Sequence, residues 1–193
     1  TLSPVSLFSA AADLLWSPIF RKFPTLRVAL SEGGIGWLPY FLERVDYIFS
    51  HTKHWTGMDL GGRLPSEVFS EHVILCFIDD AVGIENRHRM NIDNITWECD
   101  YPHSDSTWPH APEVLMKSLD GVSDEEVDKI THLNAIRHFS FDPFAHIQRE
   151  QATVGALRRK AADWDVTIRS VRHLRPETAS MGRWPAGRWS AGR

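Results

Sequence analysis

Two spacings of apolar residues divide the chain into elements of different kinds. Short apolar runs that lack a helical spacing predict buried strands. These runs occupy residues 26–31, 73–78 and 95–99. A helical spacing first appears over residues 5–22, where Pro18 should kink or shorten the helix. The stretch "IGWLPYFLERVDYIFSHT" predicts a second, longer helix, with Pro39 in its first turn, where proline is tolerated.

Further helices are predicted after the second and third strands. They span about residues 81–89, 111–119, 123–139 and 148–163. Ser123 and Glu126 have the spacing of a capping box, in which each side chain binds the backbone beside the other. Strands that alternate with helices predict an α/β fold with a parallel sheet. Because only three strands are convincing and a complete barrel takes about 250 residues, we expect part of a (β/α)8 TIM barrel.

The composition is that of a globular protein. The chain has 193 residues, of which 42% are hydrophobic and 24% are charged. Cys76 and Cys99 both lie in apolar runs, which favours buried free thiols in a reducing compartment and hence a cytoplasmic location. No signal peptide is visible, and no apolar run reaches the length of about 18 residues that a membrane span needs.

Charge is distributed unevenly along the chain. The net charge is -4, yet residues 157–193 hold 9 Lys and Arg against 3 Asp and Glu. A basic tail could bind nucleic acid or anionic lipid, but a solvated tail is the simpler interpretation. The acidic remainder would repel phosphate, so we expect neither nucleic acid nor membrane as a partner. We expect three regions: a barrel portion over 1–145, a helical extension over 146–175 and a disordered tail over 176–193.

Carboxylates follow the predicted strands at the ends where function gathers in α/β folds. Glu32 follows the first strand, and Asp100 and His103 follow the third. Strand alternation places Glu98 and Asp100 on one face, which would be costly in an apolar core. A carboxylate held at a strand end can bind a divalent metal or act as a general base.

Simpler interpretations of these carboxylates stay open. Asp100 is equally suited to capping a helix or a turn. Glu32 could bind the backbone N–H groups of the Gly33-Gly34 turn. Asp80, at the end of the second strand, is best explained as the N-cap of the helix that follows.

The loop "DYPHSDSTWPHAPE" is too polar and too aromatic for a simple connection. Its residues His103 and Trp108 lie either on plain surface or in the wall of a pocket. The chain contains no H-x-H, P-loop, G-x-S-x-G or C-x-x-C motif. A single carboxylate is not a metal site, so the residues alone leave the chemistry of this loop undecided.

Three stretches carry a family resemblance when they are taken together. "FPTLRVALSEGGIGWLPYFLERVD", "ITWECDYPHSDSTWP" and "NAIRHFSFDPF" resemble the carboxyl-terminal half of amidohydrolase-related proteins. The resemblance is to the branch that includes aminocarboxymuconate semialdehyde decarboxylase, and it covers about residues 1–145. It implies a metal-dependent (β/α)8 barrel of which this chain supplies strands six to eight with their flanking helices.

The resemblance also implies roles for the residues at the strand ends. Asp100 would be the aspartate after the last strand, acting as a metal ligand or a proton-handling group. The expected cofactor is one divalent metal ion, zinc, whose remaining ligands would lie upstream of residue 1. The decarboxylases carry "HGG" at the end of strand six where this chain has "EGG". Glu32 therefore replaces a catalytic histidine and would orient the nucleophile.

The expected function is metal-dependent hydrolysis or decarboxylation of a small carboxylated or ring-derived substrate. The catalytic residues would be Asp100 and Glu32, and His103, Trp108 and Glu98 would contact the substrate. We expect a homodimer of the full-length protein. Because no initiator Met precedes the first helix, we expect an incomplete chain, and the alternative function is that of a truncated half-barrel without activity of its own.

Overall fold

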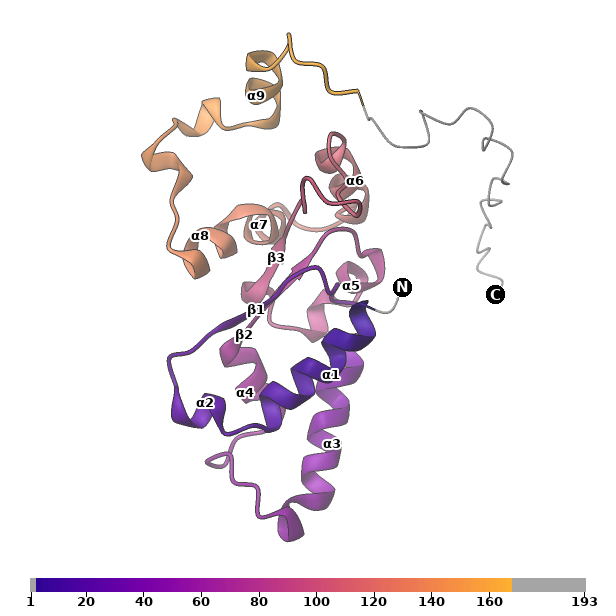
Figure 1. Ribbon diagram of the computed structural model, residues 1–193, viewed down its shortest axis with the longest axis vertical. Coiled ribbons are helices and arrows are strands. Elements are labelled where there is room, and N and C mark those ends of the chain that lie inside the picture. Colours follow the sequence, from indigo (N-terminus) through magenta and orange to yellow (C-terminus); the bar gives the residue numbers. More distant parts are fainter. Residues whose placement is uncertain (1–2, 168–193) are drawn as a thin grey trace, which may run out of the picture. The chain divides into compact units, whose positions relative to one another are not determined.

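The computed structural model describes residues 3–167 of the chain (Figure 1). The α-helices are α1 (Ser3–Trp16), α2 (Ile19–Lys22), α3 (Leu38–Thr56), α4 (Pro65–His72), α5 (Ala81–Glu85), α6 (Ala111–Ser118), α7 (Asp124–Asp128), α8 (Asn134–Phe139) and α9 (Val154–Lys160). The strands are β1 (Val28–Leu30), β2 (Val73–Phe77) and β3 (Ile95–Trp97). The predicted tail at 176–193 and the end of the predicted extension at 146–175 lie outside the described residues.

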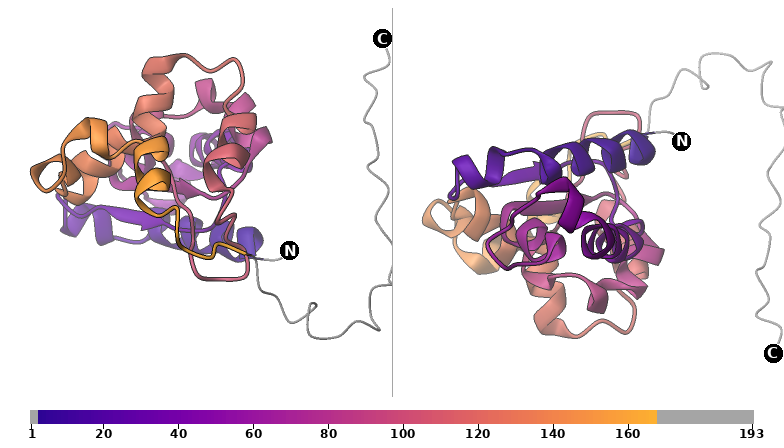
Figure 2. Two further views of the ribbon diagram at one scale, coloured as in Figure 1. Left: turned by 90° about the horizontal axis from the view of Figure 1, so that it is seen from above. Right: turned by 90° about the horizontal axis from the view of Figure 1, so that it is seen from below.

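The three strands form one parallel sheet in the order β1-β2-β3. Val28 of β1 is opposite Val73 of β2, and Leu75 of β2 is opposite Ile95 of β3. Every residue of the central strand β2 is buried, because a parallel sheet is covered on both faces. Seen end-on, α1 lies on one side of the sheet and α6 on the other (Figure 2). The predicted α/β fold and its parallel strands are confirmed.

Aromatic side chains join the helices that cover the sheet. Phe8 of α1 packs edge-on against Phe41 of α3, with ring centroids 5.0 Å apart, and the two helices lie side by side (Figure 1). Phe41 also packs against Phe69 of α4 at 5.1 Å. Pro18 separates α1 from α2, and Pro39 lies in the first turn of α3, as predicted.

The helices on either side of β2 differ from the predicted ones. The helix α4 was not predicted, because eight residues are too few to show a helical repeat. Its sequence signals are Pro65 in the first turn and Glu67, whose carboxylate accepts the N–H of Leu64 at 2.7 Å. The helix predicted over 81–89 ends at Glu85, and a turn of 3-10 helix follows over Arg87–Arg89.

The predicted helix at 123–139 begins as expected and is then interrupted. The Ser123 hydroxyl accepts the N–H of Glu126 at 3.4 Å, which confirms that half of the capping box. A turn of π-helix, Lys129–Leu133, then separates α7 from α8. It precedes the buried Asn134, whose amide donates to two backbone carbonyls beside β3. The helix predicted over 148–163 is shorter, because α9 has no buried residue to stabilise a longer one.

Contacts divide the chain into two units, Thr1–Lys160 and Ala161–Arg193. The first holds the sheet and all the helices named above, and of the second only residues 161–167 are described. Both cysteines are free thiols, as predicted. Cys76 is buried, as expected, whereas Cys99 is only half-buried because it lies beyond the end of β3. Within residues 3–167, no helix combines the length and the apolar character that crossing a membrane requires.

Candidate metal centre

Three side chains that can bind a metal converge at the carboxyl ends of the strands. Glu32 follows β1, whereas Asp100 and His103 follow β3. One ligand atom of each lies within 4.8 Å of the others. The two carboxylates come from the outer strands of the sheet, which lie on either side of β2. The parallel arrangement of the strands had predicted that Glu32 and Asp100 share one end, but not that they approach so closely.

The backbone at both carboxylates adopts an uncommon conformation. Glu32 has a φ of 60° and Asp100 a φ of 54°, which lie in the left-handed region. Residues other than glycine are uncommon there, and each costs about 1 kcal/mol. Such strained residues gather at functional sites, where the surrounding structure holds them in place. The strain is therefore a second observation that marks these two positions.

Asp100 and His103 form a direct pair. The imidazole Nδ1 and the carboxylate Oδ1 lie 2.6 Å apart. The side chain of Asp100 is only 6% exposed, whereas that of His103 is 69% exposed. The hydrogen bond to Asp100, together with its negative charge, raises the pKa of His103 above the usual value. His103 thus covers a buried carboxylate from the solvent side.

Glu98 lies directly behind this group. Its Oε1 accepts the backbone N–H of Glu32 at 2.5 Å. Burial raises the pKa of the Glu98 carboxyl, and the charges of Glu32 and Asp100 add to the effect. The contact that the structure shows for Glu98 is with the backbone of the loop after β1, and its predicted contact with substrate stays a prediction. No sequence pattern pointed to it, because 66 positions separate the two residues.

Asp80 binds more of the backbone than was predicted. Its Oδ1 accepts the N–H of Gly83 at 2.7 Å, which confirms its role as the N-cap of α5. Its Oδ2 also accepts the N–H groups of Ile35 and Gly36, at 2.6 and 2.7 Å. Asp80 therefore binds the two N–H groups that follow the Gly33-Gly34 turn in the "EGGIG" segment. The hint in the sequence was the repeated glycine of this segment.

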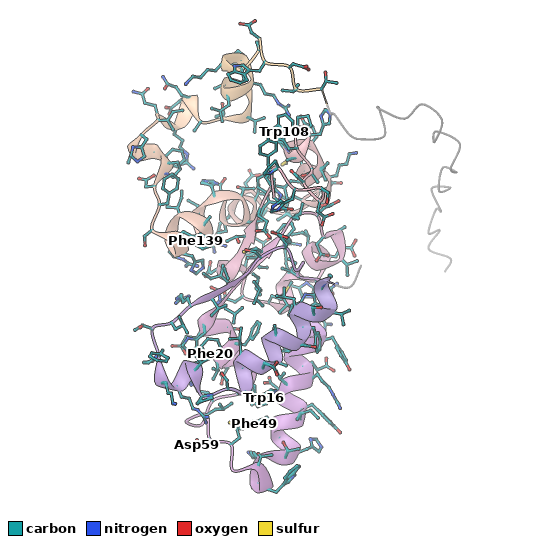
Figure 3. The ribbon with its side chains drawn as sticks, in the orientation of Figure 1. Trp16, Phe20, Phe49, Asp59, Trp108 and Phe139 are labelled. Carbon is teal, nitrogen blue, oxygen red and sulfur yellow. The ribbon has the colours of Figure 1, made fainter. Side chains whose placement is uncertain are left out.

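The loop between β3 and α6 forms an aromatic edge to the site. Trp108 is 41% exposed, and its ring centroid lies 5.0 Å from that of Tyr101. It lies beside α6, whereas Asp59 and Phe49 lie at the other end of the molecule's first unit (Figure 3). Trp108 is thus at the same end as the three converging side chains but is not one of them.

An open cavity of about 370 Å³ adjoins the converging side chains. Its lining includes Glu32, Trp37, Asp79 and Asp105. Trp37 is fixed by a bond from its Nε1 to the carbonyl of Gly33 at 3.0 Å. Sequence reasoning missed Trp37, because its place in the first turn of a predicted helix suggested packing alone. The lining is rich in carboxylates, which favours a cation over an anion at this position.

The chemistry of the donor set fits a divalent metal ion. Two carboxylates and one imidazole offer oxygen and nitrogen ligands from three residues, Glu32, Asp100 and His103. Magnesium and manganese prefer oxygen ligands, whereas zinc sites usually hold more nitrogen or sulfur. Three protein ligands leave positions open for substrate or water, as catalytic metal sites require. The set is therefore suited to a hard divalent cation.

Comparisons with known proteins give similar solved structures, each at low sequence identity. One is 5-carboxyvanillate decarboxylase from Sphingomonas paucimobilis, with 22% identity, a TM-score of 0.57, and coverage of 69% of this chain and 39% of that chain. Another is an amidohydrolase from Mycobacterium avium subsp. paratuberculosis, with 19% identity, a TM-score of 0.58, and coverage of 70% and 34%. A third is a dihydroxybenzoic acid decarboxylase from Polaromonas sp. JS666 with bound manganese and the inhibitor 2-nitroresorcinol, with 24% identity, a TM-score of 0.55, and coverage of 69% and 39%. No curated protein matches the sequence.

These likenesses establish the fold, and a family model establishes the family. The strands and flanking helices of this chain correspond to part of a TIM barrel, and the chain spans 34% to 39% of the length of those structures. The model described as amidohydrolase matches residues 4–141. The resemblance found in the sequence is thus confirmed, and because the match extends over more than half of the chain, the protein belongs to the amidohydrolase family.

Proposed function

We propose that the protein functions in metal-dependent hydrolysis or decarboxylation of a small carboxylated or ring-derived molecule. The observation that carries the proposal is the convergence of Glu32, Asp100 and His103 at the carboxyl ends of the strands. Active sites of TIM barrels lie at this face, built from the loops that follow the strands. The family supports an enzyme of this kind, and the solved neighbours include two decarboxylases.

We assign a metal-binding role first to Asp100, because its carboxylate is the most buried of the three and is already fixed by His103. Glu32 and His103 complete the donor set. A bound divalent cation would supply Lewis acidity toward a substrate carbonyl or carboxylate oxygen. Zinc was expected from the resemblance, and the oxygen-rich donor set makes manganese or magnesium an equal or better candidate. Further ligands from upstream of residue 1 remain part of this proposal.

Because the site is rich in carboxylates, we expect substrate to bind only when the metal is bound. Glu32, Asp79 and Asp105 line the cavity, and Asp100 and Glu98 lie beside it. A carboxylated substrate would be repelled by this set of negative charges unless a cation offset them. Metal and substrate should therefore bind in that order.

Trp108 and Tyr101 support the choice of a ring-derived substrate. Their rings stand 5.0 Å apart and remain substantially exposed at the end where the donors converge. Aromatic faces of this kind favour planar apolar groups. We assign His103 and Trp108 to substrate contact as well, whereas Glu98 acts at the backbone of Glu32.

The second candidate is a half-barrel that has no activity by itself. Within the described residues, β1 and β3 each pair only with β2, so both outer strands have one edge without a partner strand. A homodimer or a longer chain would be needed to complete a barrel in that case. We retain the prediction of a cytoplasmic location, because both cysteines are free thiols.

A turnover assay separates the two candidates. The protein is stripped with a chelator, reloaded with manganese or zinc, and incubated with a panel of small carboxylated ring compounds, while released carbon dioxide and hydrolysis products are measured. Metal-dependent turnover that Asp100→Ala abolishes is expected. Asp59→Ala is the matched control, since Asp59 only caps the N–H of Gly61 at 2.8 Å far from the site. Metal binding without turnover of any compound would favour the inactive half-barrel, and equal turnover with and without metal would refute the proposal.

A further inference from the structure

The segment that carries Glu32 is held by carboxylates from both of the other strands. Glu98, after β3, accepts the N–H of Glu32 at 2.5 Å. Asp80, after β2, accepts the N–H groups of Ile35 and Gly36 at 2.6 and 2.7 Å. Both ends of the segment 32–36 are thus fixed by charged acceptors. Hydrogen bonds from backbone N–H groups to a carboxylate are about twice as strong as those between neutral groups.

The glycines of this segment allow Asp80 to come so close. A Cβ placed on Gly34 would lie 3.0 Å from Asp80 Oδ2, and one on Gly36 would lie 3.0 Å from Asp80 Oδ1. Gly83, on the other side of Asp80, would place a Cβ 2.9 Å from the same carboxylate. A side chain at any of these positions would push the carboxylate away from the N–H groups that it binds. Glycine at positions 34, 36 and 83 therefore lets Asp80 make these contacts.

The position of Glu32 depends on this arrangement. Its φ of 60° is unfavourable for a residue with a side chain, so other interactions must hold it. The bond from its own N–H to Glu98 acts on the residue itself. Glu98 itself is half-buried, which limits the positions that its carboxylate can take. Losing that acceptor would release the backbone that turns the Glu32 carboxylate toward Asp100.

We propose that Glu98 and Asp80 are positioning residues that hold the segment 32–36, so that the Glu32 carboxylate meets Asp100 and His103 around one divalent cation. This inference rests on the proposed function for its metal, but the backbone contacts stand without it. Glu98 then acts through Glu32 and needs no contact with substrate.

Two variants of Glu98 separate positioning from a general loss of structure. Glu98→Gln keeps an acceptor oxygen, whereas Glu98→Ala removes it. Exchange of the Glu32 amide proton with solvent is measured by NMR, and manganese affinity is measured by calorimetry on the same samples. We expect Glu98→Ala to speed the exchange at Glu32 and to weaken manganese binding by about 10- to 100-fold. Glu98→Gln should restore both to within about threefold of the original protein.

A matched control and a second variant guard against misfolding. Glu71→Ala removes a glutamate of α4 that pairs with Arg63. Neither amide exchange at Glu32 nor manganese affinity should change in this variant. Asp80→Asn offers only one acceptor oxygen for three N–H groups, so exchange at Ile35 or Gly36 should speed up. If Glu98→Ala fails to fold, the comparison of Asp80→Asn with the original protein decides the matter.

Each outcome has a defined meaning. Faster exchange at Glu32 in Glu98→Ala, with rescue by Glu98→Gln, supports positioning, and unchanged exchange or unchanged manganese affinity overturns it. If the original protein binds no manganese, the proposed function fails. The amide exchange then decides by itself whether Glu98 and Asp80 hold the segment.

Discussion

Gly34 is restrained both by its backbone conformation and by its closeness to Asp80. Its φ is +64°, and an added Cβ would lie 3.0 Å from the Asp80 carboxylate. Gly61 has a similar φ of +66° but nothing within 4 Å of such a Cβ. Gly61→Ala should therefore lower the free energy of unfolding by about 1 kcal/mol through backbone strain alone. Gly34→Ala should lower it by about 2 to 3 kcal/mol, since crowding adds to the strain.

Urea unfolding of the two alanine variants measures this difference. Equal losses of stability would show that Asp80 moves aside without cost, and would contradict the tight contact between Asp80 and the segment 32–36. The comparison is informative because both variants carry the same chemical change at the same backbone conformation.

At the same scale, the sequence predicted some residues of the site and not their contacts. Asp100 and Glu32 could be found because each ends an apolar run, and the ends of parallel strands gather function. The bond from Glu32 to Glu98 could not be found, since it joins residues 66 positions apart. Asp80 was predicted as a local helix cap, and its two long-range bonds to Ile35 and Gly36 depend on how the strands pair.

Between elements, one partly buried ion pair links the 3-10 turn after α5 to α7. Arg87 donates from Nη2 and Nε to Glu126 Oε2, at 2.8 and 3.1 Å. The hydrogen bond from Arg87 lowers the pKa of Glu126 below its usual 4.5. A carboxyl with a lowered pKa contributes stability above its unfolded-state pKa, and that contribution is lost as the pH falls through the folded-state pKa.

Replacing Arg87 should therefore have an effect that depends on pH. Arg87→Met should reduce the free energy of unfolding by about 1 kcal/mol near neutral pH. Below the folded-state pKa of Glu126 the difference should shrink to the part that comes from the bond of Arg87 Nη1 to the Ile84 carbonyl. Arg63→Met is the control, because Arg63 and Glu71 are each about half exposed (45% and 48%) and should contribute almost nothing. Thermal melts over a series of pH values would show a constant difference if this pairing were not the cause.

The elements also show which parts of the fold a sequence pattern can predict. The strands and α3 were predicted well, because β2 is buried throughout and α3 is long enough to repeat its apolar spacing. The helix α4 was missed because it is short, and the π-turn at Lys129–Leu133 was missed because helical spacing continues across it.

For the molecule as a whole, the edges of the sheet predict association. In the part of the chain that the structure describes, β1 and β3 each have one edge without a partner strand. Such edges favour pairing with another chain. We expect concentration-dependent self-association, or binding of a hydrophobic dye, which light scattering and fluorescence would detect. A monomer of uniform size with a sharp thermal transition would count against this expectation.

The central claim is that Glu32, Asp100 and His103 bind one divalent cation. Calorimetric titration of the chelator-treated protein with manganese tests it most directly. A ligand that binds only the folded state also stabilises it, by about 2.7 kcal/mol at 100 times the dissociation constant. We predict about one manganese ion per chain, a matching rise in melting temperature, and loss of both in Asp100→Ala but not in Asp59→Ala. Equal manganese binding by Asp100→Ala and the original protein, or none by either, would contradict the account.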